Sequence, residues 1–276
     1  MSISFIEEAS GNDPSIESNT NCLFRQELSP SLRPRCFKHF VGQKEAVTCL
    51  ETYCKAAKNR NEPLDHVLLS GRPGLGKTTL AGIIAYEMNS NMRITSGPAI
   101  EKSGDLIALL TNLSEGDILF IDDIHRLNRH LFEVLFPAME DCCADIIIGK
   151  GPSANSIHLD LPHFTLICAT YRADCLSVAF RNRFGIQIEL RPYTAEELKE
   201  AIQYFCKILE LQIDEKSIAL ISEAGNGTPR ELLKILNRIN DFAQIYQKGT
   251  ITADLTEKAL DLMEATGLKR RQTSEL

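Results

Sequence analysis

Apolar residues in the first two thirds of the chain occur in short, nearly uninterrupted runs separated by longer amphipathic segments. Three such runs are Val67–Leu69, Ile118–Ile121 and Phe164–Ala169. Runs of this kind, without polar alternation, are typical of strands buried on both faces, as in a parallel sheet. The segments between them have apolar residues at helical spacing and predict helices over 43–58, 78–88, 104–113 and 129–141. The pattern therefore predicts an α/β domain with a central parallel sheet.

The pattern changes at Pro192, after which the periodic segments are all helical. Thr194 and Glu197 form a capping box, which starts a helix. Amphipathic helices are predicted over 195–209, 215–224, 229–247 and 251–263. We therefore expect a large α/β domain over 31–191, a small all-helical domain over 192–265, and tails over 1–30 and 266–276. The first tail is rich in Ser, Asn and Glu and is predicted to be disordered.

Residues 145–152 and 156–161 are predicted to form a β-hairpin around a turn that contains Gly and Pro. Its apolar residues Ile146, Ile147 and Ile148 allow two interpretations. They either pack in the core or lie on a projecting hairpin that contacts a partner protein. The residues alone favour the core.

A glycine-rich loop directly follows the first apolar run. Residues 71–78 match the P-loop pattern G-x-x-x-x-G-K-[ST]. Glycines let the backbone approach a phosphate chain closely, and the N–H groups at the start of the next helix bind anions. Lys77 is expected at the β- and γ-phosphates of ATP, and the Thr78 hydroxyl at Mg²⁺. The loop residues expected at the nucleotide are Gly71, Gly74, Leu75, Gly76, Lys77, Thr78 and Thr79.

The run Ile118–Ile121 ends in two acidic residues, Asp122 and Asp123. Acidic residues at the carboxyl end of a buried strand form the Walker B arrangement, in which Asp122 would hold Mg²⁺. The pattern is weak by itself and gains its meaning from the P-loop that precedes it. Farther along, Arg181 and Arg183 lie in a short loop. They form either a salt-bridged surface or an arginine finger that reaches a nucleotide bound by a neighbouring subunit.

The overall charge limits what the chain can bind. Its 30 basic and 37 acidic residues give a net charge of −7, which argues against binding DNA by bulk electrostatics. The sequence shows no run long enough for a transmembrane helix and no basic-then-apolar secretion signal, so we expect a cytoplasmic protein that does not contact membranes. The nine cysteines include no C-x-x-C pair and are expected to be reduced.

These motifs and several more specific stretches resemble the RuvB family, the AAA+ motors of Holliday-junction branch migration. The resemblance spans about 30–265, and residues 95–102 and 149–153 are particular to RuvB rather than general to AAA+ ATPases. The matching stretches are 32–34, 40–43, 62–69, the P-loop, 94–102, 121–128, 146–156, 183–185 and 227–230.

The resemblance implies a role for several residues. Arg33, Pro34, Val41 and Gly42 would enclose the adenine. Asp122 and Asp123 would be the Walker B pair, Arg183 the finger of a homo-oligomeric ring, by analogy a hexamer, and Arg230 the second sensor on the helical lid. The hairpin 146–159 would dock a RuvA-like junction-binding protein, which raises the partner interpretation of this hairpin above core packing.

Three departures from the family pattern bear on activity. Asp123 stands where the family has glutamate, so its carboxylate is one methylene short of the family's position. Tyr171 stands at the first-sensor position, where the family has a small hydroxyl residue. The family's winged-helix domain, which grips DNA, would follow the lid, but the sequence stops at Leu276; we expect weak DNA binding by the chain alone.

Three functions therefore compete. The first is an ATP-hydrolysing RuvB-type motor, favoured by the intact Lys77, Thr78, Asp122, Arg183 and Arg230. The second is a RuvB-like nucleotide-binding subunit that hydrolyses poorly and acts as a regulatory or structural component of a ring, favoured by Asp123 and Tyr171. The third is a clamp-loader-like AAA+ subunit, which leaves the RuvB-specific stretches unexplained.

Overall fold

A computed structural model describes residues 32–148, 155–246 and 249–266. Its centre is a five-stranded sheet in the order β2-β3-β6-β1-β7, in which all neighbouring strands are parallel. The predicted α/β class is confirmed, although the sequence analysis did not foresee β7. The strands are β1 Val67–Ser70, β2 Met92–Ser96, β3 Ile118–Asp122, β6 Thr165–Thr170 and β7 Ile186–Glu189.

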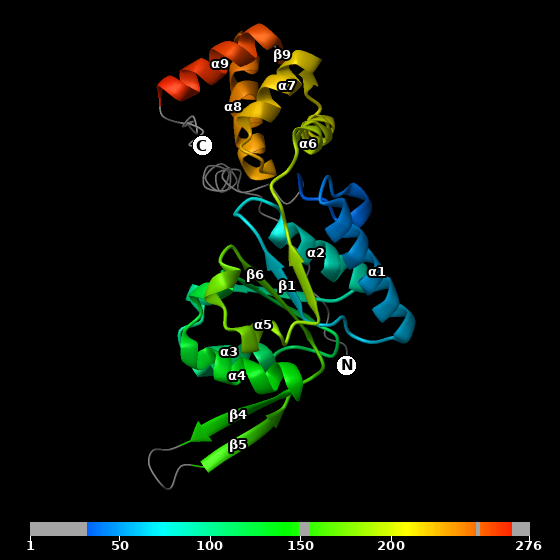
Figure 1. Ribbon diagram of the computed structural model, residues 1–276, viewed down its shortest axis with the longest axis vertical. Helices are drawn as coiled ribbons and strands as arrows, with labels where there is room; N and C mark the ends of the chain where they lie inside the picture. The colour runs from blue at the N-terminus through cyan, green and yellow to red at the C-terminus, as the bar shows by residue number, and fades with distance from the viewer. Residues whose placement is uncertain (1–31, 149–154, 247–248, 267–276) are drawn as a thin grey trace, which may run out of the picture.

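The apolar runs form the three central strands because both faces of the sheet are covered. Along β3, Ile118 and Phe120 face one buried cluster, and Leu119 and Ile121 face the other. The first face is covered by α1 Lys44–Arg60 and α2 Lys77–Met88. The second face is covered by α3 Ser103–Thr111, α4 Arg129–Glu140 and α5 Val178–Arg181. Figure 1 shows the sheet between these two layers of helices.

The helical domain lies at one end of the molecule (Figure 1). The capping box predicted at Thr194 and Glu197 is formed, with the Glu197 N–H donating to Thr194 Oγ1 and the Thr194 N–H donating to Glu197 Oε2. Besides helices, this domain contains a short parallel strand pair that the sequence analysis missed, because each strand has only two residues. Its elements are α6 Ala195–Ile208, β8 Gln212–Ile213, α7 Glu215–Ala224, α8 Pro229–Tyr246, β9 Thr250–Ile251 and α9 Ala253–Ala265.

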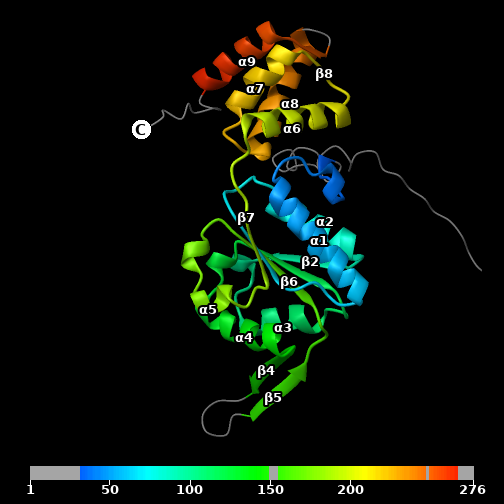
Figure 2. The same ribbon diagram turned by 45° about the vertical axis from the view of Figure 1, so that its right-hand side comes forward.

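The predicted hairpin is also formed, from β4 Cys143–Ile148 and β5 Asn155–Asp160. It projects from the end of the molecule opposite the helical domain, and this is clear in both views (Figures 1 and 2). Ile157 is 43% exposed on it. The side chains of Ile146–Ile148 and the turn at 149–154 lie outside the described residues, so the choice between core and partner contact stays a prediction.

No helix in the part of the chain that the structure describes combines the length and apolar character needed to span a bilayer. The eight cysteines in the same residues are free thiols.

His66 directly precedes β1 and connects it to β6 and α4. Its Nδ1 accepts the Leu166 N–H at 2.9 Å, and its Nε2 lies 3.2 Å from the Met139 carbonyl oxygen. Nδ1 is therefore an acceptor and Nε2 carries the proton. Burial lowers the pKa of the imidazole because it disfavours the charged form, and the hydrogen bond to the Met139 carbonyl acts in the opposite direction.

We predict that His66 contributes to acid sensitivity. The folded-state pKa of His66 lies below the unfolded value of about 6.5. The unfolded state therefore binds more protons below that pH, and stability is lost as the pH falls from about 6.5 toward the folded-state pKa. His66→Ala should cost roughly 1–3 kcal/mol at pH 7.5, measured by urea unfolding, and less at pH 5.5. His130→Ala on the exposed side of α4 is the control. An equal loss of stability between the two pH values in wild type and His66→Ala would contradict the assignment.

Candidate nucleotide-binding site

The P-loop connects β1 to α2 at the carboxyl edge of the sheet, where β3 and β6 also end. Gly74 and Gly76 have φ of +86° and +100°, values that side-chain-bearing residues rarely adopt. Space is restricted as well: a Cβ on Gly76 would lie 2.9 Å from Phe40 Cζ, and one on Gly74 would lie 3.0 Å from Arg230 Cβ. The loop is thus held against both the segment before α1 and the helical domain.

Lys77 begins α2 and is largely buried. Its Nζ donates to the carbonyl oxygens of Gly71 at 2.7 Å and Arg72 at 3.0 Å. Burial lowers the pKa of this amine, and the carboxylates of Asp122 and Asp123 act in the opposite direction. The loop therefore holds a buried cation at the start of a helix whose free N–H groups already favour anions.

Asp122 is the last residue of β3, and Asp123 follows it directly. The Asp123 N–H donates to Asp122 Oδ1 at 2.9 Å, which orients the Asp122 carboxylate. Asp123 adopts a left-handed conformation with φ of 49°. Behind it, Gly97 packs so closely that a Cβ there would lie 2.6 Å from the Asp123 carbonyl oxygen. Gly97 comes from the RuvB-like stretch 95–102, and its packing explains why a residue without a side chain is needed there.

A polar cavity of about 190 Å³ collects most of the predicted site residues. Two residues predicted at the site, Gly71 and Leu75, are not among those that line this cavity: the Gly71 carbonyl accepts a hydrogen bond from Lys77, and Leu75 is buried in the core. The P-loop, the end of the Walker B strand, the residue after β6 and the helical domain together bound the cavity. Its lining residues are Arg33, Pro73, Gly74, Gly76, Lys77, Thr78, Thr79, Asp122, Asp123, Tyr171 and Arg230.

Tyr171 lines this cavity and contacts a residue that the sequence analysis missed. Its ring lies edge-on to His125, with centroids 4.4 Å apart. His125 Nδ1 is 3.1 Å from Thr170 Oγ1, and the same oxygen accepts the Arg172 N–H at 3.0 Å. Burial lowers the pKa of His125. The position of His125, two residues after the acidic pair, was the available signal in the sequence.

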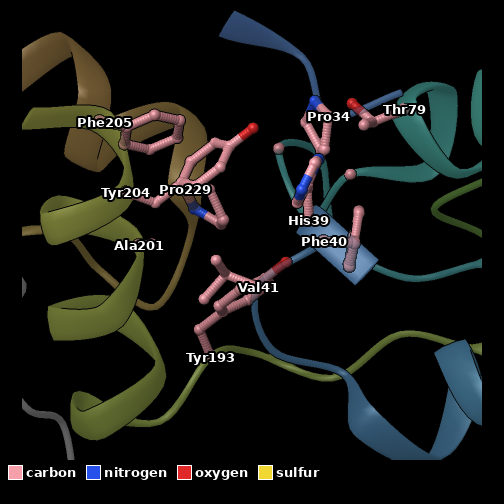
Figure 3. Close-up of a pocket in the computed structure, with 12 residues that line it drawn as sticks. Pro34, His39, Phe40, Val41, Thr79, Tyr193, Ala201, Tyr204, Phe205 and Pro229 are labelled. Atoms are coloured by element: carbon pink, nitrogen blue, oxygen red, sulfur yellow. The ribbon is translucent and has the colours of Figure 1, made fainter. Parts of the chain in front are cut away.

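A second, mostly apolar pocket adjoins the polar cavity and shares Gly74, Gly76 and Thr79 with it. Pro34 and Val41, both expected at the adenine, line this pocket, while Gly42 lies behind its wall, against Tyr193. Figure 3 shows the side chains of the helical domain on one side of this pocket and those of residues 34–41 and Thr79 on the other. An apolar, aromatic pocket beside a phosphate site suits a nucleotide base. The lining residues that the sequence analysis missed are His39, Phe40, Tyr193, Ala201, Tyr204, Phe205 and Pro229.

Arg183 is not among the residues that line the polar cavity. Its Nε is 3.1 Å from Glu140 Oε1, its Nη1 donates to the Ala179 carbonyl at 2.7 Å, and its guanidinium lies 4.1 Å from the centre of the Phe136 ring. Both interpretations of Arg183 remain compatible with this position, because the residue forms a salt bridge and does not reach its own chain's nucleotide site. Arg181 has a buried Nε without a hydrogen-bond partner among the described residues.

The parallel sheet, P-loop, Walker B strand and helical lid define a P-loop ATPase of the AAA+ class. Residues 32–190 match the model of the Holliday junction DNA helicase RuvB P-loop domain, and residues 193–266 match that of the RuvB AAA lid domain. The fold is similar to that of the Thermotoga maritima RuvB Holliday junction branch migration motor, with 40% identity over 85% of this chain and 74% of that one, and a TM-score of 0.77. A point mutant of the same protein gives 40% identity, 84% and 74% coverage, and a TM-score of 0.78.

The chain belongs to the RuvB family. Membership implies nucleotide binding and places the chain in the family of the Thermotoga maritima Holliday junction branch migration motor. The matches give no support to a clamp-loader-like subunit.

We predict that Gly97→Ala impairs catalysis, because the added Cβ must displace the Asp123 backbone or Leu127, whose N atom it would approach to 3.0 Å. A shift of about 1 Å can reduce turnover up to about a hundredfold, and overpacking costs roughly 1–3 kcal/mol of stability. Gly104→Ala is the matched control, since a Cβ there meets no atom within 4 Å. Steady-state ATPase rates and thermal melting check this; wild-type rates in Gly97→Ala would contradict the packing argument.

Proposed function

We propose that this chain is the ATP-hydrolysing subunit of a RuvB-type motor that drives Holliday-junction branch migration in recombination and repair. The observation that carries the proposal is the polar cavity in which Lys77, Asp122 and Asp123 from the α/β domain meet Arg230 from the lid. A buried cation, a carboxylate pair and a second cation on a separate domain are the groups that a Mg²⁺–ATP complex requires.

Each residue of the cavity then has a role in binding or hydrolysis. The P-loop N–H groups and Lys77 bind the phosphate chain. The Thr78 hydroxyl and the Asp122 carboxylate would hold Mg²⁺, which would supply positive charge to the phosphates. Asp123 orients the attacking water and accepts its proton. Arg230 brings the lid onto the γ-phosphate.

The adjoining apolar pocket accommodates the adenine. Its walls come from residues 34–41 and from the lid helix α6, so the base contacts both domains. Arg33, which lines the polar cavity, and Gly42, which supports the pocket wall, complete the set expected at the nucleotide. A base held between two domains makes nucleotide binding sensitive to their relative orientation.

The motor acts as a homo-oligomeric ring, a hexamer by analogy with the family, in which Arg183 reaches the γ-phosphate of the neighbouring subunit. The distance of Arg183 from its own cavity supports this role in trans. The projecting hairpin 146–159 is the docking site for a RuvA-like protein, supported by its isolation at the far end of the molecule and by the exposed Ile157. The net charge of −7 makes direct DNA contact by this chain weak, so recruitment falls to the partner.

Asp123 and Tyr171 lower the rate of hydrolysis. The shorter aspartate places its carboxylate farther from the water than a glutamate would, and the tyrosine ring packs on His125, where a small hydroxyl residue would leave room. The same two residues favour the second candidate function, a nucleotide-holding subunit that regulates an active partner.

We predict that Asp123→Glu accelerates the chemical step. Single-turnover hydrolysis of ATP with Mg²⁺ should be about tenfold faster than in wild type, because the longer side chain brings the base closer to the water. Lys77→Ala should abolish binding and serves as the negative control. Tyr171→Thr tests the second residue in the same assay.

The outcomes separate the two candidates. Hydrolysis by the wild type, with acceleration by glutamate, supports a motor with a slowed chemical step. If the wild type, Asp123→Glu and Tyr171→Thr all bind ATP without hydrolysing it, the motor is refuted and the regulatory subunit is left. An unchanged rate in Asp123→Glu would show that aspartate is not limiting.

A further inference from the structure

Glu197 is a buried carboxylate outside the phosphate site. It lies in the first turn of α6, and its side chain is 9% exposed. Burying an ionised carboxylate is unfavourable unless hydrogen bonds and an opposite charge compensate. A residue that only capped a helix would not need this degree of burial, so its partners indicate what else it does.

Four hydrogen bonds converge on the two oxygens of Glu197. Oε1 accepts the Gln43 N–H at 3.1 Å and Arg191 Nη2 at 3.0 Å. Oε2 accepts the Thr194 N–H at 2.9 Å and Arg191 Nη1 at 2.8 Å. These bonds occupy the full acceptor capacity of a carboxylate, with the arginine bound bidentately. Burial raises the pKa of Glu197, but the bonds from Arg191, Thr194 and Gln43 outweigh it and hold the pKa below its usual value.

The partners come from both domains. Gln43 precedes α1 in the α/β domain, whereas Arg191 and Thr194 belong to the connection into the lid. The Gln43 side chain is also buried and pairs with the Arg191 backbone: its Oε1 accepts the Arg191 N–H at 3.2 Å, and its Nε2 donates to the Arg191 carbonyl. Next to it, Gly42 packs on Tyr193, where a Cβ would lie 2.6 Å from Tyr193 Cε1. Gly42, Gln43, Arg191 and Glu197 therefore form a junction between the domains.

This junction lies directly behind the apolar pocket. Val41, which lines the pocket from one side, is two residues from Gln43. Ala201 and Tyr204 line it from the lid, and they follow Glu197 on α6 at intervals of four and seven residues, so they share its helix face. Glu197 thus connects the segment that carries Val41 to the helix that carries Ala201 and Tyr204.

We propose that Glu197 is a positioning residue for nucleotide-base binding, fixing residues 40–43 against α6 so that the apolar pocket keeps the width of a purine. The inference rests on the proposed function, because it takes the pocket as the adenine site. It assigns to Glu197 an effect on the base only. The phosphates are bound by the P-loop, and the hydrogen bonds that the Glu197 side chain accepts among the described residues come from Gln43, Arg191 and Thr194 instead.

The test compares two ligands on the intact chain. ATP uses both the apolar pocket and the P-loop, whereas inorganic triphosphate uses the P-loop alone. Glu197→Ala should raise the Kd of Mg²⁺–ATP about tenfold or more while leaving the Kd of Mg²⁺–triphosphate within about twofold, as removal of a buried, hydrogen-bonded charge predicts. Glu197→Gln keeps one acceptor oxygen and should give an intermediate change. Glu196→Ala, at the exposed neighbouring position, is the matched control.

The ratio of the two Kd values is the decisive quantity, because partial unfolding would weaken both ligands equally. An equal loss for ATP and triphosphate, or no change for either, in Glu197→Ala and Glu197→Gln would overturn the assignment. Wild-type protein that binds triphosphate but not ATP would refute the adenine pocket itself. Wild-type protein that binds ATP without hydrolysing it would contradict the proposed motor but leave the role of Glu197 fully testable.

Discussion

The structure depends on one constraint: a phosphate-binding loop must expose backbone N–H groups beside a buried cation at the carboxyl edge of a parallel sheet. Lys77 meets it by donating to the carbonyls of Gly71 and Arg72, so the loop is closed around its own cation. The sheet order then brings β3 beside β6 and β6 beside β1, which places Asp122 within the same cavity. Burial of the amine is tolerated because carboxylates and carbonyl oxygens surround it.

The helical domain completes the site because the α/β domain supplies only part of it. Arg230 reaches the polar cavity from α8, and Tyr204 and Phe205 line the apolar pocket from α6. One continuous apolar cluster runs from the face of the sheet that α1 and α2 cover into this domain. Under the proposed function, such an arrangement would couple the state of the nucleotide to the orientation of the lid, a property that a ring motor needs to turn hydrolysis into movement between subunits.

The sequence predicted the parts of the fold and site that are encoded locally. The P-loop and Walker B strand follow from a few consecutive residues, and the capping box at Thr194 fixed the start of the lid. The missing parts depend on contacts between distant residues: Glu197 and Gln43 are 154 positions apart, and His125 meets Thr170 across 45. The strands β8 and β9 have only two residues each, too short for any periodic signal. A buried carboxylate with partners in another domain leaves no pattern along the chain.

The central claim, an ATPase ring with a finger acting in trans, is tested most directly by mixing two inactive variants. Arg183→Ala keeps its own nucleotide site, and Lys77→Ala keeps its finger. Neither should hydrolyse ATP appreciably alone, whereas their mixture should recover activity that peaks at an intermediate ratio, because a Lys77→Ala subunit supplies Arg183 to the site of its neighbour. A mixture no more active than its separate components, or wild-type activity in Arg183→Ala alone, would contradict the account.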